Sequence, residues 1–131
     1  MSRSGLRLRL TDWRLAVLKF SPDATPPAWV FHNSVQFYSI TRTPNELSIV
    51  CAEDDLPPSV ESNVERGWAA FELEGPIPFT TTGVISGLTT PLAAAGVSVF
   101  VISTFDTDYL LVKAVHVERA EHVWSEYLTA R

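Results

Sequence analysis

The chain has 131 residues, of which 46% are hydrophobic and 19% charged, so it can form one compact domain or two very small ones sharing a core. A net charge of −5 argues against nucleic acid as a partner. The single cysteine, Cys51, excludes an internal disulfide and fits a reduced cytoplasm. No apolar run approaches the roughly 18 residues of a membrane span, and Leu6–Leu10, which alternates Leu with Arg, is unlike a signal peptide. We therefore expect a soluble cytoplasmic protein without a membrane partner.

The first half of the chain predicts β-structure broken by prolines. Strict alternation and β-rich composition predict four strands: Leu6–Leu10, Arg14–Phe20, Gln36–Arg42 and Leu47–Cys51. The last two strands should form a hairpin. Prolines leave room for only one helical turn, at Ala28–Asn33, between the first two strands and this hairpin. Glu53-Asp54-Asp55 reads as a solvated turn. A short helix capped by Ser59 is expected over Ser59–Arg66.

The second half predicts strand, helix, strand, strand and helix. Trp68–Glu74 reads as a strand, and a helix capped by Thr82 runs to about Ala95, with Gly96 as its C-terminal stop. The remaining elements are two strands and a final helix: Val97–Ser103, Tyr109–Lys113 and about Val115–Leu128. A strand–helix–strand–strand–helix–strand unit needs one more strand, which Leu6–Leu10 could supply. The first half is a cruder version of the same order.

The turn between the two late strands gathers short polar side chains. Apolar strands that flank an exposed polar turn can present a site for a small polar ligand. A helix N-terminus near Gly83 and Gly87 would favour a carboxylate, and Asp106 or Asp108 could bind an ammonium group. Either aspartate could instead hold backbone amides of the turn, and this alternative stays open.

These residues carry a family resemblance. Pro91-Leu92-Ala93, Val97-Ser98-Val99, Ser103–Asp108 and Tyr109–Val112 resemble the signature of ACT domains, in the tandem-ACT branch with small bacterial ACT proteins and the cytosolic arginine sensors of the TOR pathway. The resemblance implies an α+β fold of two ferredoxin-like (βαββαβ) units in tandem, with antiparallel sheets and helices on one face. The units would be residues 1–66 and residues 67–131, and strand 6–10 could complete the second unit.

The resemblance also implies a non-enzymatic, amino-acid-binding regulatory protein. ACT domains bind an effector where two units meet, so the ligand would lie at an interface between units, and a homodimer and a regulatory target protein are expected. The implied ligand-binding residues come from the helix start and the turn: Gly83, Val84, Ser86, Gly87, Leu88, Thr104, Phe105, Asp106, Thr107 and Asp108. The alternative is an ACT-fold protein–protein interaction module without a metabolite ligand.

Enzymatic and metal chemistry find little support in the sequence. The Asp106/Asp108 pair has no third acidic residue or histidine close in sequence that would complete a metal site. Ser86 does not stand in the G-x-S-x-G elbow of a serine hydrolase, and Cys51 has no histidine nearby. His116 and His122 are spaced so that they do not share a helix face as a metal pair at i, i+4 would. We expect no catalytic residues, no metal and no cofactor.

Overall fold

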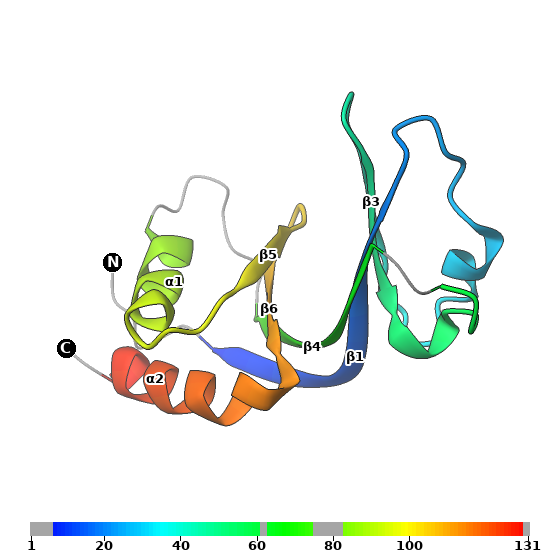
Figure 1. The fold of residues 1–131 in the computed structure, drawn as a ribbon. Coiled ribbons are helices and arrows are strands. Elements are labelled where there is room, and N and C mark those ends of the chain that lie inside the picture. Colours follow the sequence, from blue (N-terminus) through cyan, green and yellow to red (C-terminus); the bar gives the residue numbers. More distant parts are fainter. Residues whose placement is uncertain (1–6, 61–62, 75–82, 130–131) are drawn as a thin grey trace. The chain divides into compact units, whose positions relative to one another are not determined.

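The computed structural model describes residues 7–60, 63–74 and 83–129 (Figure 1). Within these residues the fold is mixed α/β, with six strands that pair in the order β2-β3-β1-β4-β6-β5 and two α-helices. The strands are β1 (Leu8–Phe20), β2 (Ser39–Arg42), β3 (Leu47–Ala52), β4 (Val64–Leu73), β5 (Phe100–Ser103) and β6 (Asp108–Lys113). The helices are α1 (Val84–Ala94) and α2 (Val117–Thr129), with 3₁₀ turns η1 (Ala28–His32), η2 (Glu53–Asp55) and η3 (Ala114–His116).

The chain divides into two compact units. Trp13–Trp68 form one, which we call the proline-rich unit, and the residues up to Asp12 together with those from Ala69 onward form the other, the helical unit. Because β1 and β4 both cross these boundaries, each long strand contributes to both units. The helical unit therefore has the strand order β1-β4-β6-β5, and the proline-rich unit has the order β2-β3-β1-β4.

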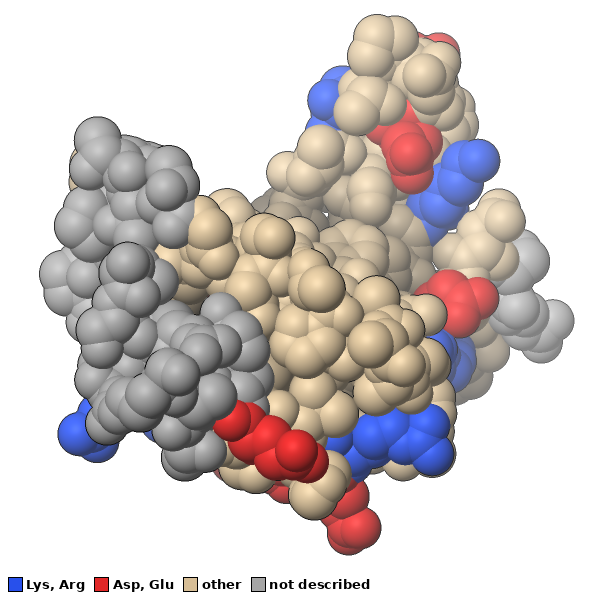
Figure 2. Space-filling view, turned by 90° about the vertical axis from the view of Figure 1, so that its left-hand side faces the viewer, with Lys and Arg blue, Asp and Glu red and all other residues tan. Residues whose placement is uncertain are grey.

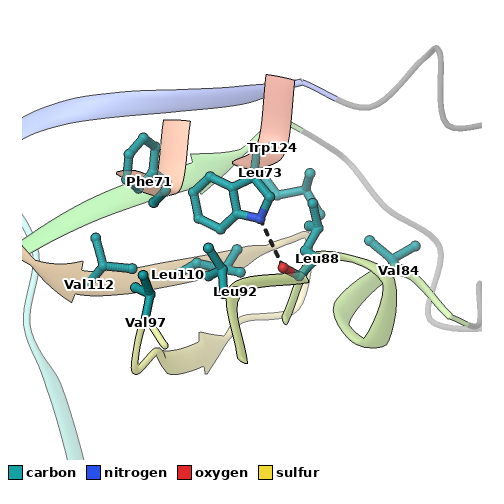
Figure 3. Packing of buried hydrophobic residues seen from close by; sticks show 10 residues of the cluster. Phe71, Leu73, Val84, Leu88, Leu92, Val97, Leu110, Val112 and Trp124 are labelled. Carbon is teal, nitrogen blue, oxygen red and sulfur yellow. Dashed lines mark hydrogen bonds between the residues drawn. The ribbon is translucent and has the colours of Figure 1, made fainter. Parts of the chain in front are cut away.

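The core of the helical unit lies between its strands and both helices (Figure 3). The buried side chains alternate along β4 and β6 and recur at helical spacing on α1: Phe71, Leu73, Leu110, Val112, Val84, Leu88 and Leu92. Trp124 of α2 completes this core. Its ring meets Phe71 edge to face, with centroids 4.9 Å apart, and its Nε1 donates a hydrogen bond of 2.9 Å to the Leu88 carbonyl.

Helix α1 tolerates a proline and ends at a glycine. Pro91 lacks the amide that would reach the Gly87 carbonyl, yet the helix continues to Ala94. Gly96 adopts the left-handed conformation with φ 76°, and the Val97 amide turns back to the Leu92 carbonyl at 2.9 Å. The predicted stop at Gly96 is confirmed. Thr82, the predicted cap at the other end, lies outside the described residues.

In the proline-rich unit, short turns take the places of helices. The hairpin of β2 and β3 forms as predicted, with Arg42 opposite Leu47 in the antiparallel register. The buried core consists of Ala16, Leu18, Val30, Leu47, Ile49 and Cys51. Within this buried core, Val30 comes from η1 and the other residues come from strands. Leu56, next to η2, is partly buried and packs against the core. The single turn predicted at Ala28–Asn33 is observed as η1.

Four predicted elements need correction. The helix over Ser59–Arg66 is wrong, because Val64 already begins β4 and the Asn63 carbonyl accepts the Lys19 amide of β1 at 3.0 Å. Sheet pairing overrides the local helical signal there. The two predicted strands Leu6–Leu10 and Arg14–Phe20 are one continuous strand from Leu8 onward. The later strand predicted from Val97 begins only at Phe100.

Candidate ligand site

The start of α1 offers backbone amides. Its N-cap residue Gly83 has φ 79°, a conformation that favours glycine, and the Gly87 amide closes the first turn on the Gly83 carbonyl at 2.9 Å. Among the described residues, no side chain caps this end, and the first turn holds no acidic residue. The amides that precede the first helical hydrogen bond, with the positive end of the helix dipole, therefore suit a carboxylate.

The side chains at this helix start divide into buried and accessible. Val84 and Leu88, both predicted ligand contacts, are 5% and 0% exposed and belong to the hydrophobic core (Figure 3). Ser86 is exposed and Gly87 partly so. On this side of the site, a ligand can be met by backbone groups and by the Ser86 hydroxyl, whereas Val84 and Leu88 hold the helix in place.

The polar turn after β5 is closed by threonines. The Thr104 amide donates to the Thr107 carbonyl at 2.8 Å, and the Thr107 amide donates to Thr104 Oγ1 at 3.3 Å. This reciprocal pairing pushes the tip of the turn outward: Phe105 is 79% exposed, and Asp106 is exposed as well.

The two aspartates of the turn have different surroundings. Asp108 begins β6 opposite Ser103 of β5, and its Oδ1 accepts a hydrogen bond from Ser103 Oγ. Asp108 thus bonds a side chain of its own hairpin, which is a structural role of the kind that the sequence left open as an alternative to ligand binding. Asp106 stands at the exposed tip, where its carboxylate can reach a ligand.

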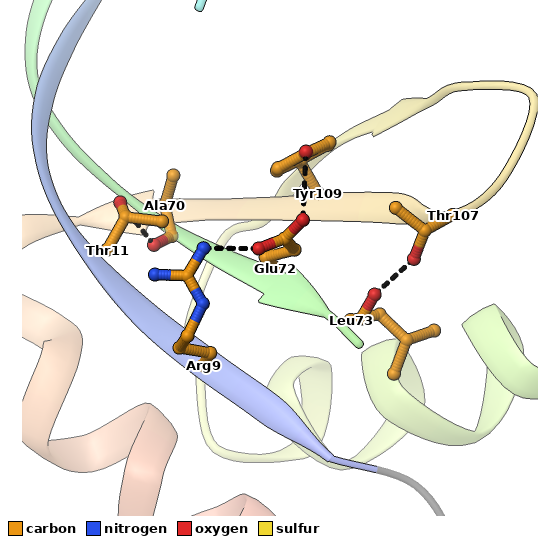
Figure 4. Close-up of polar contacts among 7 residues, drawn as sticks. All are labelled: Arg9, Thr11, Ala70, Glu72, Leu73, Thr107 and Tyr109. Carbon is orange, nitrogen blue, oxygen red and sulfur yellow. Dashed lines mark hydrogen bonds and ion pairs between the residues drawn. The ribbon is translucent and has the colours of Figure 1, made fainter. Parts of the chain in front are cut away.

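Leu73 joins the turn to the helix start. Thr107 Oγ1 donates to the Leu73 carbonyl at the end of β4 (Figure 4), while the Leu73 side chain belongs to the same core cluster as Val84 and Leu88. The turn is thus bonded to the end of β4, and the residue at that end shares a buried core with the start of α1. Sequence reasoning had no way to identify Leu73 as the link, because the contact is made by its backbone.

Sequence reasoning also missed a polar network beside the turn (Figure 4). Glu72 of β4 accepts hydrogen bonds from Arg9 Nη2 through Oε1 and from the Tyr109 hydroxyl through Oε2, the latter at 3.1 Å. The hydrogen bond to Glu72 raises the pKa of Arg9. The pKa of Tyr109 is raised mainly by burial and also by its hydrogen bond to Glu72. The charges in Leu6–Leu10 and Trp68–Glu74 were visible, but the register that makes Arg9 and Glu72 neighbours was not.

Acidic and basic side chains are interspersed on the face shown in Figure 2, and most of the described surface there belongs to residues other than Lys, Arg, Asp and Glu. Within the described residues, no group of three or more His, Cys, Asp or Glu could hold a metal ion. No helix in the same ranges is long and apolar enough to cross a membrane. What the described site offers is hydrogen-bonding groups and carboxylates.

Comparison with known proteins identifies the family. A family model described as ACT domain matches residues 63–124, and a separate model of an N-terminal domain matches residues 14–59. A crystal structure of protein Atu0741 from Agrobacterium tumefaciens superposes with a TM-score of 0.83 at 35% identity, covering 93% of this chain and 88% of that one.

Two curated human proteins are also similar. Putative protein CASTOR3P is 30% identical over 107 residues, which cover 72% of this chain and 64% of that protein. Cytosolic arginine sensor for mTORC1 subunit 1 is 27% identical over 134 residues, covering 82% of this chain and 38% of the sensor. The chain thus spans under two thirds of the length of either. Residues 63–124 therefore belong to the ACT-domain family.

Proposed function

We propose that this protein is a non-enzymatic regulatory protein that binds an amino acid beside the start of α1. The observation that carries the proposal is the helix start at Gly83, which lacks a side-chain cap in the described residues and is tied through Leu73 to a polar turn. Membership of the ACT family and similarity to a protein named as an arginine sensor support the same class of ligand.

The chemistry of the site suits a zwitterion. The amides at the start of α1 would hold the ligand carboxylate, and Ser86 would add a hydroxyl. Asp106 would hold the ammonium group in a charge-assisted hydrogen bond of roughly 1.5–3 kcal/mol. Thr104, Thr107 and Asp108 would shape the turn. With carboxylates on the turn, a ligand with a cationic side chain is favoured over one with an anionic side chain.

We infer that each unit is a variant of the ferredoxin-like βαββαβ arrangement. In the helical unit, β4, α1, β5, β6 and α2 follow in chain order, and β1 pairs beside β4 to supply the remaining strand. In the proline-rich unit, η1 and η2 occupy the helix positions between β1, β2, β3 and β4. The first part of β1 would then complete the second unit of the predicted tandem, which is the helical unit.

Regulation would follow from linkage. A homodimer would bring a unit of a second copy against the helix start and the turn, and a ligand held there would stabilise that arrangement by its differential affinity. A target protein that contacts one arrangement better than the other would then respond to the ligand.

The test is a thermal-unfolding panel of the full chain against the twenty amino acids. A ligand at 100 times its dissociation constant stabilises the fold by about 2.7 kcal/mol, an easily measured shift in melting temperature. We expect one amino acid to give this shift and Asp106→Asn to remove it. Asp23→Asn, which changes an exposed carboxylate of the proline-rich unit outside every proposed site, is the matched control and should keep the shift.

The second candidate is an interaction module that binds no metabolite. Phe105 favours it, because a phenyl ring 79% exposed at the tip of a turn is suited to insertion into a partner protein. A panel without any shift would support this alternative and overturn amino-acid binding. Phe105→Ser should then weaken the oligomer or complex, measured by sedimentation velocity.

A further inference from the structure

The segment between η1 and β2 holds an aromatic pair at the surface of the proline-rich unit. Phe31 is 52% exposed and Tyr38 is 41% exposed, and their rings meet edge to face with centroids 5.4 Å apart. Large exposed rings that pack on one another form a contact surface for another molecule.

The backbone of the same segment is held in an unusual conformation. Asn33 and Gln36, neither of them glycine, have φ of 53° and 61°, and the Gln36 amide closes a turn on the Asn33 carbonyl at 3.0 Å. Asn33 Oδ1 is buried without a hydrogen-bond partner among the described residues. Such costs persist where the surrounding structure enforces them, and they concentrate at functional sites. Here they accompany the turn that presents the two rings.

Acidic groups lie beside this turn. The Ser34 amide donates to Asp55 Oδ2 at 3.1 Å, which fixes the turn against η2, and η1 also packs against η2. Asp54 is exposed, and Asp55 is half-buried. The aromatic pair and these carboxylates thus belong to two segments in contact, and together they would attract a cation. A guanidinium group fits best, because it stacks on rings and bonds carboxylates through two N–H groups.

We propose that the Phe31–Tyr38 segment and η2 form a docking site for an arginine side chain of a partner protein. The surface is open, with about half of each ring accessible, whereas a small free ligand needs a pocket that encloses most of its area. A partner that brings further contacts does not need that enclosure. The net charge of −5 favours a basic partner.

The first experiment is a nitrogen-15 NMR titration of the full chain with the peptide acetyl-Gly-Arg-Gly-Arg-Gly-amide. We expect saturable shifts of the amides of residues 31–38 and 53–55. The same peptide with citrulline in place of arginine keeps the shape and removes the charge, so it should give no saturable shift. Equal binding of both peptides, or no shift in these residues, would overturn the proposal.

Three variants locate the site. Phe31→Leu keeps an apolar side chain but removes the ring, and should weaken the peptide affinity about threefold to tenfold. Asp54→Asn should weaken it about twofold without disturbing the core. Val115→Ala, which changes an apolar residue 86% exposed in the helical unit, is the matched control and should leave the affinity unchanged. Unchanged affinity in both Phe31→Leu and Asp54→Asn would contradict the assignment.

Free arginine is the decisive comparison ligand. If it shifts residues 31–38 with an affinity equal to that of the peptide, the site takes a small molecule and the docking proposal fails. Shifts confined to residues 83–88 and 104–108 would report on the amino-acid site of the helical unit. The two proposals can therefore fail separately in one titration.

Discussion

The helical unit and the proline-rich unit follow corresponding strand orders but cover their strands differently. In the helical unit α1 and α2 supply five of the ten residues of the buried core cluster, including Trp124. In the proline-rich unit the covering segments are η1 and η2, and Val30 is the one residue of the buried cluster that comes from them. The prolines near these segments forbid longer helices. Strand pairing therefore tolerates the loss of covering helices when other contacts replace them.

The replacement in the proline-rich unit is side-chain bonding to the backbone. Arg42 donates to the carbonyls of Pro22 and Ala24, and Glu53 Oε1 accepts the Gly67 amide at 2.7 Å. Loops leave peptide groups without helical partners, and charged side chains satisfy them here. The comparison predicts that the helical unit depends most on apolar packing and the proline-rich unit on charge-assisted bonds.

The largest effect should come from the core of the helical unit. Trp124→Ala removes a buried ring and its bond to the Leu88 carbonyl, so we expect a loss of about 3–5 kcal/mol in the free energy of unfolding, measured by urea denaturation. Trp124→Phe, which keeps most of the packing, should lose less than half of that amount. A Trp124→Ala variant within about 1 kcal/mol of the parent would contradict the role assigned to this ring.

The next largest effect is a pH dependence in the proline-rich unit. Burial raises the pKa of the Cys51 thiol to about 11 from an ordinary value of 9.0. Because the unfolded thiol ionises first, its contribution to stability is complete below pH 9 and is lost as the pH rises towards 11. The loss should be about 2 kcal/mol. Chemical denaturation of the parent and of Cys51→Ala between pH 9 and 11 should show that the free energy of unfolding declines less steeply in the variant. Parallel plots of that free energy against pH would refute the raised pKa.

A smaller effect is expected from the acidic turn. Glu53→Gln replaces a charge-assisted bond to the Gly67 amide by a neutral one, which should cost about 1 kcal/mol in chemical denaturation. Asp54→Asn, at the exposed neighbour, should leave stability unchanged within error. If both substitutions behave alike, the bond to Gly67 contributes nothing specific.

The smallest effect should be local. Arg42→Gln removes donors to the Pro22 and Ala24 carbonyls, so the loop that they close should open more often. Hydrogen exchange at the Ala24 amide, which bonds the Ser21 carbonyl at 3.0 Å, should speed up several-fold, while amides of the helical unit keep their rates. Uniform acceleration in both units would show that Arg42 acts on global stability instead.

Local signals in the sequence predicted much of the fold. The hairpin of β2 and β3, the start of α1 near Gly83 and its stop at Gly96 each depend on a few neighbouring residues. Pairing between distant strands was harder: the helix expected at Ser59–Arg66 gave way to β4, because Lys19 pairs with Asn63. The same limit concealed the contact of Arg9 with Glu72, since a register is set by the whole sheet.

The sequence allowed the residues of the candidate site to be named, but not the role of each residue. The turn Thr104–Asp108 could be recognised by its composition, but its bond to the Leu73 backbone could not. The burial of Val84 and Leu88 follows from their spacing on the core face of α1, a pattern that the sequence shows for the whole helix. Their presence among the predicted ligand contacts came from the resemblance alone.

The passage of β1 and β4 through both units has a consequence for folding. Arg9 and Glu72 are 63 residues apart in the chain, so the sheet of the helical unit joins segments that are synthesised far apart in time. Contacts of such long sequence separation slow folding, because the loop between them must be closed first. The local hairpin of β2 and β3 can form early, whereas Leu8–Asp12 must wait for β4. Folding of the helical unit should therefore be slow, because it joins residues before Trp13 to residues after Trp68, whereas the proline-rich unit is one contiguous stretch.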